Sequence, residues 1–191
     1  MKIAIVGDSH LTDVSPKERI DPDYFGTILD KIRAIYENND IIIHLGDLFD
    51  KPTLNHSALN RIFSFFLEMR NKRIFSIIGN HDVPHLNSNL LFRTTLGHLD
   101  TLGFVRVVDE NFKAGGISFD VVKFGSIAHI PLEKKSDFLI GHCFFENEFD
   151  PDYSLKMKEV SESGYKNVFL GHDHSPYDIQ KIGDTDLYRI G

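Results

Sequence analysis

Four short motifs concentrate aspartate, asparagine and histidine side chains. They appear in the order Gly7–His10 (GDSH), Gly46–Asp50 (GDLFD), Gly79–Asp82 (GNHD) and Gly171–His174 (GHDH). Carboxylate, amide and imidazole groups bind divalent transition metals in proteins, whereas the single cysteine in 191 residues offers almost no thiolate. The motifs therefore indicate a centre for divalent cations that is built from oxygen and nitrogen ligands.

Such a centre suits the hydrolysis of a phosphate ester. At neutral pH this reaction needs an activated water molecule, positive charge near the phosphoryl oxygens and stabilisation of the leaving group, and two divalent ions supply most of these. Two ions roughly 3.5 to 4 Å apart need a carboxylate between them, with imidazole and carbonyl ligands outside. This mixture favours Mn²⁺, with Fe²⁺ and Zn²⁺ as alternatives, over Mg²⁺.

The motifs follow apolar segments of the kind that form buried strands. The sequence predicts strands over Lys2–Val6, Asp40–Leu45, Arg73–Ile78, Phe104–Val108, Ile117–Phe124, Asp137–Ile140, Asn167–Leu170 and Leu187–Ile190. It predicts helices over Asp21–Asn38, with Asp21 as N-cap and Pro22 at the first position, and over Ser57–Arg70, Leu90–Leu102 and Ser154–Ser163. This alternation predicts an α/β protein, in which sites form at the carboxyl ends of strands.

Each motif has an ordinary explanation when it is taken alone. Asp8 and His10 could cap a turn, and Gly79-Asn80 is a common turn dipeptide. His172 and His174 could be two exposed loop histidines. However, four independent turns would each have to carry ligand-type side chains at the same end of successive strands. We therefore interpret the four motifs as parts of one metal centre.

The composition is that of a single acidic, globular domain. Hydrophobic residues make up 41% of the chain and charged residues 26%, and the formal net charge is −7. No apolar run approaches the roughly 18 residues of a membrane span and no signal sequence is visible, so we expect a cytoplasmic protein. The negative charge argues against broad nonspecific DNA binding. Bound cations would nevertheless make the cleft locally positive.

The order of the motifs, with a lone Gly141-His142 before the last one, resembles that of the calcineurin-like metallophosphoesterases. The resemblance spans Met1–His174 and implies an α/β fold, the four-layer αββα sandwich with two mixed central sheets. GDLFD, GNHD and the closing IGDTDLYRIG are most similar to SbcD-type repair nucleases and their bacteriophage recombination relatives. Those nucleases continue into a capping region, whereas this sequence stops at Gly191. We therefore expect one catalytic domain over residues 1–191, without a capping domain.

The resemblance also implies a role for each motif residue. One metal ion would take Asp8, His10, Asp47 and His174, and the other would take Asp47, Asn80, His142 and His172. Asp47 would bridge the ions, because a neutral asparagine could not hold two dications close together. His81 is the candidate proton donor to the leaving oxygen, with Asp50 as its candidate partner, although Asp50 could equally be a carboxylate at a helix start. Asp82 is interpreted as a supporting group or an N-cap.

The other histidines and the basic residues have simpler explanations. His44 lies in a predicted strand and is expected to be buried, whereas His85 follows GNHD closely and could touch a substrate. Arg70–Arg73 and Lys134-Lys135 are the compact basic groups of the sequence. A solvated turn explains both groups, and they are also the first place to look for contacts with DNA.

Three functions remain open from the sequence. The preferred one is a Mn²⁺-dependent phosphodiesterase acting on DNA ends, an exo/endonuclease in repair or recombination that works with an SbcC-type ATPase and could form a homodimer. The second is a phosphatase or phosphodiesterase for small nucleotides or phosphorylated metabolites. The third is a catalytically silent scaffold of the same fold. The Phe-rich stretch Ile62–Met69 could form a dimer contact, but we interpret it as core.

Overall fold

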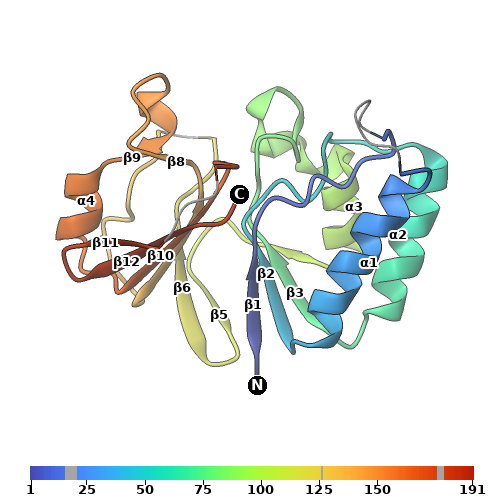
Figure 1. Cartoon of the computed structure of the whole chain (residues 1–191), viewed down its shortest axis with the longest axis horizontal. Helices are drawn as coiled ribbons and strands as arrows, with labels where there is room; N and C mark the ends of the chain where they lie inside the picture. Colours follow the sequence, from blue (N-terminus) through green and yellow to red (C-terminus); the bar gives the residue numbers. More distant parts are fainter. Residues whose placement is uncertain (16–20, 126, 176–178) are drawn as a thin grey trace.

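In the computed structural model, which describes residues 1–15, 21–125, 127–175 and 179–191, two β-sheets lie face to face between outer helices (Figure 1). The first sheet has the order β1-β2-β3-β4, and its neighbouring strands pair in parallel. Its strands are β1 (Ile3–Val6), β2 (Ile41–His44), β3 (Arg73–Ser76) and β4 (Arg106–Val107). Its outer face is covered by α1 (Tyr24–Glu37), α2 (His56–Glu68) and α3 (Thr95–Thr101).

The second sheet is mixed and has the order β11-β12-β10-β7-β6-β5. The four central strands pair in parallel, and β5 and β11 are antiparallel edge strands. The strands are β5 (Phe112–Ala114), β6 (Ile117–Val121), β7 (Phe138–His142), β10 (Asn167–Gly171), β11 (Gln180–Ile182) and β12 (Thr185–Arg189). The remaining elements are α4 (Met157–Glu162), the short pair β8 (Phe144–Phe145) and β9 (Ser154–Leu155), and the 3₁₀ helices η1 (Pro84–Leu86), η2 (Ser88–Arg93) and η3 (Pro151–Tyr153).

The alternation of side chains along β2 explains the layers. Ile41 and Ile43 face the second sheet and share a core with Ile140. Ile42 points to the opposite face and packs with Leu29 of α1. A third core lies between the second sheet and α4. The four-layer αββα sandwich is therefore confirmed. The expectation of two mixed sheets is wrong for the first sheet, because its described strands all pair in parallel, and holds only for the second.

The helix over the first predicted segment starts later than expected. Its N-cap is Asp23, whose Oδ1 accepts a bond from the backbone N–H of Gly26 at 3.1 Å, and not Asp21. Asp21 instead accepts bonds from Thr27 Oγ1 and the Asp23 N–H. The predicted end near Asn38 is correct. The stretch Ile62–Met69 contributes Ile62, Phe65, Phe66 and Met69 to the core, as interpreted from the sequence, whereas Leu67 is 51% exposed.

Two predicted helices are interrupted by local hydrogen bonds. Leu90–Leu102 divides into η2 and α3 because Thr94 is extended and caps α3, accepting a bond from the Gly97 N–H at 3.1 Å. Ser154–Ser163 begins as strand β9 and becomes helical from Met157. The two- and three-residue strands β5, β8 and β11 were not predicted, because their pairing depends on distant partners. Among the described residues, no helix is long and apolar enough to cross a membrane.

A buried polar pair joins α1 to β2. His44 and Tyr36 are both 0% exposed, and the Tyr36 hydroxyl lies 2.7 Å from His44 Nε2. Burial lowers the pKa of His44 to about 4. The imidazole is therefore neutral in the folded protein at neutral pH. The prediction that His44 is buried is confirmed.

This pair predicts acid sensitivity. Because the folded-state pKa of His44 lies below its ordinary value of 6.5, the unfolded chain binds more protons as the pH falls from about 6.5 towards 4. The contribution of His44 to the free energy of unfolding should drop by about 2 kcal/mol between pH 7 and pH 5. Urea denaturation of wild type and His44→Gln over this range measures it as the difference between the two pH profiles. Parallel profiles would contradict the account.

Candidate metal centre

Strands from both sheets deliver the motif residues to one edge of the sandwich. β1 leads into Asp8 and His10, β2 into Asp47, β3 into Asn80, and β10 into His172 and His174, while β7 ends at His142. These positions follow the carboxyl ends of parallel strands, the usual place for sites in α/β proteins. All the ligands expected from the sequence therefore meet in one cluster.

Glycines allow the loops to approach so closely. A Cβ atom at Gly79 would lie 2.1 Å from Asp47 Oδ1, and one at Gly46 would lie 2.6 Å from His142 Nδ1. Gly46 also has φ of +91°, a left-handed conformation that favours glycine. The glycines of the GDLFD and GNHD motifs thus serve to bring Asp47 against its neighbours.

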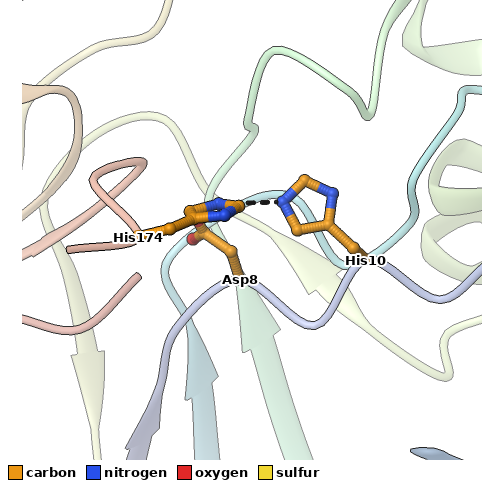
Figure 2. A group of neighbouring side chains, drawn as sticks. All are labelled: Asp8, His10 and His174. Carbon is orange, nitrogen blue, oxygen red and sulfur yellow. Dashed lines mark hydrogen bonds and ion pairs between the residues drawn. The ribbon is translucent and has the colours of Figure 1, made fainter. Parts of the chain in front are cut away.

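Asp8, His10 and His174 form one half of the centre. His174 Nε2 lies 3.1 Å from His10 Nε2 and 3.2 Å from Asp8 Oδ2 (Figure 2). The backbone N–H of His172 donates to the same Asp8 oxygen at 2.7 Å. Asp8 Oδ1 is buried and has no hydrogen-bond partner among the described residues. Facing imidazole nitrogens beside a carboxylate with a free oxygen fit a bound cation.

His142 anchors the other half. Its Nε2 lies 2.9 Å from Asn80 Oδ1, 3.2 Å from His172 Nδ1 and 3.3 Å from Asp47 Oδ2. Its Nδ1 lies 2.8 Å from the carbonyl oxygen of Leu45, to which an Nδ1–H donates. That bond leaves the Nε2 lone pair for a metal ion.

The Asp47 carboxylate lies between the two halves. Asp47 Oδ2 is 3.3 Å from His142 Nε2 and 3.8 Å from His10 Nε2, and Asp47 Oδ1 accepts a bond from the His81 N–H at 2.8 Å. Burial opposes the ionisation of Asp47, but the hydrogen bond and charge of His142 hold its pKa below the usual value. This position is the one that the predicted bridging role requires.

The electrostatics also fit divalent cations. Burial raises the pKa of Asp8 to about 6, with the Asp47 charge acting in the same direction, and burial lowers the pKa of His10. Two carboxylates and five imidazoles share this edge of the fold, those of Asp8, Asp47, His10, His81, His142, His172 and His174, and bound cations would satisfy free lone pairs among them. The residues present therefore suit two divalent ions. The ligand assignment itself stays a prediction.

His81 and Asp50 meet, but through a different contact from the expected one. His81 Nδ1 donates to the backbone carbonyl oxygen of Asp50 at 2.7 Å, so its Nε2 is left free of that bond. The Asp50 carboxylate instead lies 3.5 Å from His10 Nδ1. The His81 and His10 rings are 4.7 Å apart, centroid to centroid. His81 thus adjoins the centre, and its contact with Asp50 is made by the backbone and not by the side chain.

Asp82 holds the backbone of the two loops that carry Asp47 and Asn80, which fits the supporting role expected from the sequence. It is 0% exposed and accepts bonds from the backbone N–H groups of Gly79 at 3.0 Å and Phe49 at 3.3 Å. Burial, together with the Asp47 charge, raises its pKa to about 7. Sequence reasoning missed the Leu45 carbonyl and the Phe144 ring, which lies 4.1 Å from the His172 ring. No sequence motif marks such contacts, because any residue can supply a backbone carbonyl and an aromatic residue can contact many kinds of neighbour.

The basic groups lie away from the centre. Arg70–Arg73 leads into the amino end of β3, and Lys134-Lys135 precedes the amino end of β7, whereas the ligands follow the carboxyl ends. If these groups contact DNA, they do so at the edge of the fold opposite the metal centre, and their role stays a prediction. Among the other histidines, His85 is exposed three residues beyond Asp82.

The bridging geometry predicts the effect of one substitution. Asp47→Asn should lose bound metal and phosphodiesterase activity together, because the amide removes the charge shared by both halves of the site. Metal content by mass spectrometry and hydrolysis of a bis-aryl phosphodiester measure the two effects. Asp30→Asn, on the exposed face of α1, is the matched control and should change neither. Near-normal metal content in Asp47→Asn would refute the bridge.

Known proteins share this arrangement of motifs. The model of the calcineurin-like phosphoesterase family matches residues 1–180. The chain is also 30% identical, over a 219-residue alignment, to the DNA double-strand break repair protein Mre11 of Saccharolobus solfataricus. That alignment covers 99% of this chain and 55% of Mre11, so the chain spans about half the length of that relative. Because the family model covers nearly the whole chain, the protein belongs to the calcineurin-like phosphoesterases, a family of metal-dependent hydrolases.

Proposed function

We propose that this chain is a two-metal-dependent phosphodiesterase that cleaves DNA, as an exo/endonuclease of the SbcD type in repair or recombination. The observation that carries the proposal is the convergence of seven candidate ligands with His81 at one edge of the sandwich. The similarity to Mre11, a DNA double-strand break repair protein by name, supports DNA as the substrate class. Every candidate ligand is a residue able to bind metal, which disfavours a silent scaffold.

The chemistry divides between the ions and the chain. Two divalent ions, for which we propose Mn²⁺, would lower the pKa of bound water and neutralise charge on the phosphoryl group. Asp47 holds the two halves of the centre together, and His142 is oriented for this by the Leu45 carbonyl. His81, whose Nδ1 is held by the Asp50 carbonyl, keeps Nε2 available to deliver a proton to the leaving oxygen.

Substrate charge must be met mainly by the ions. Two cations near the centre, Lys51 and Arg189, are already paired, Lys51 with Asp13 at 2.5 Å and Arg189 with Asp173 at 3.4 Å. With a net charge of −7, the chain offers little attraction to a long polyanion. This charge distribution is the observation that favours the second candidate function, a phosphodiesterase for small nucleotides.

The proposal extends to the setting of the enzyme. We propose that residues 1–191 act as one catalytic domain in the cytoplasm. An SbcC-type ATPase would be its partner, and a second copy of the chain could complete a homodimer. These parts rest on the resemblance of the motifs GDLFD and GNHD to those of SbcD-type nucleases.

Replacing His81 tests its role as a proton donor. His81→Ala should keep both metal ions and reduce turnover by on the order of a hundredfold or more, because the group that protonates the leaving oxygen is lost. Metal content and steady-state hydrolysis of a phosphodiester with a poor leaving group measure this. His98→Ala, an exposed histidine of α3, is the control. Loss of metal in His81→Ala would mean that His81 is a ligand.

The proposed function is tested by hydrolysis with the Mn²⁺-loaded protein. Labelled single- and double-stranded DNA and a bis-aryl phosphodiester are assayed side by side, with Asp47→Asn as the inactive control. We expect cleavage of DNA that is lost in Asp47→Asn. Cleavage of the small diester without any cleavage of DNA would reject the nuclease and support the small-nucleotide function.

A further inference from the structure

A short segment beside the metal centre has features that the proposed chemistry does not use. Residues 84–93, here called the rim segment, follow Asp82 and comprise η1 and η2. Thr95, two residues after the end of this segment, donates a hydrogen bond from its backbone N–H to the carbonyl oxygen of Pro52. Pro52 lies two residues after Asp50, in the loop that follows β2. The segment therefore lies against the loop that carries the bridging carboxylate.

The segment also reaches towards the second sheet at the same edge. A Cβ atom at Gly125 would lie 3.6 Å from the Leu86 carbonyl oxygen. Gly125 follows β6, which runs parallel to β7, and β7 ends at His142. Leu86 is thus placed where chains leave the carboxyl ends of strands from both sheets, as the metal ligands do.

The backbone of the rim segment is strained at two exposed residues. His85 and Leu86 have φ of +56° and +54°, a left-handed conformation that residues with a Cβ rarely adopt. Leu86 is 44% exposed and Phe92 is 64% exposed. Strain that presents an apolar side chain to solvent next to a catalytic site points to a function in binding.

Charge on the rim segment complements a phosphate backbone. The Arg93 guanidinium lies over the Phe92 ring, 5.2 Å from its centroid, and has no carboxylate partner among the described residues. Lys51 and Arg189, in contrast, are both paired with aspartates. Arg93 and Phe92 therefore place a free positive charge and a flat apolar surface side by side, the combination that binds single-stranded nucleic acid.

We propose that the rim segment binds unpaired nucleotides at a DNA end and guides them to the metal centre. Arg93 pairs with a backbone phosphate, Phe92 stacks on a base, and Leu86 contacts the neighbouring base. This inference rests on the proposed nuclease function and adds the element that would hold its substrate. It assigns DNA contacts to an edge of the fold that lacks the compact basic groups of the sequence.

The salt dependence of DNA binding distinguishes the phosphate contact of Arg93 from the base stacking of Phe92. The Mn²⁺-loaded protein is titrated with a fluorescent single-stranded oligonucleotide that carries uncleavable phosphorothioate linkages, at several salt concentrations. Arg93→Ala should flatten the plot of log affinity against log salt by about 0.7, the value for one lost phosphate contact on a single strand. Phe92→Ala should weaken binding about tenfold without changing that slope. Arg70→Ala, an exposed arginine at the opposite edge, should change neither.

Leu86→Gly tests the strained residue. Glycine accepts the φ of +54°, so the melting temperature should not fall, while affinity for the oligonucleotide should drop. A Leu86 that merely stabilises the loop would instead lower the melting temperature and leave affinity unchanged, which would overturn its assigned contact.

The outcomes distinguish this inference from the proposed function. If the wild type binds and cleaves single strands while Arg93→Ala and Phe92→Ala behave like Arg70→Ala, the rim segment is not the binding element and the nuclease stands. If the wild type with a full complement of metal neither binds nor cleaves any oligonucleotide, the nuclease function fails and the rim inference fails with it.

Discussion

The placement of one carboxylate, that of Asp47, organises the rest of the site. Its oxygens contact groups from both halves of the centre, His142 on one side and His10 on the other, at 3.3 and 3.8 Å. This contact requires two loops from different strands to approach without side chains between them, which Gly46 and Gly79 permit. The two-sheet fold can therefore be understood as a frame that brings five strand ends to this carboxylate.

Keeping such a centre together opposes the stability of the fold. Asp8, Asp47 and Asp82 are buried within one cluster of loops, and burying charge is unfavourable unless other charges or hydrogen bonds compensate. His10, Asp47 and His172 also have positive φ values, each of which costs roughly 1–2 kcal/mol for a residue with a Cβ. The three hydrophobic cores offset these terms, and bound cations would relieve the electrostatic part.

Local sequence patterns were sufficient for the α/β class and for the gathering of the four motifs at one site, whereas the four layers and the individual ligand assignments came from the resemblance to the family. Apolar strands followed by ligand residues predict where loops must meet in an α/β fold. Individual hydrogen bonds could not be predicted from the sequence. Examples are the Thr94 cap, which divides a predicted helix, and the bond from His81 to the Asp50 carbonyl. The distance of the basic groups Arg70–Arg73 and Lys134-Lys135 from the metal centre was also not predictable, because the motifs alone do not say which edge of a sheet a turn occupies.

The most direct test of the bridging role of Asp47 is electron paramagnetic resonance of the Mn²⁺-loaded wild-type protein, with metal content measured on the same sample. A single carboxylate between two half-sites should give two ions per chain whose spins are exchange-coupled. A spectrum of magnetically isolated Mn²⁺, at one or two ions per chain, would contradict the account and separate the two halves of the centre.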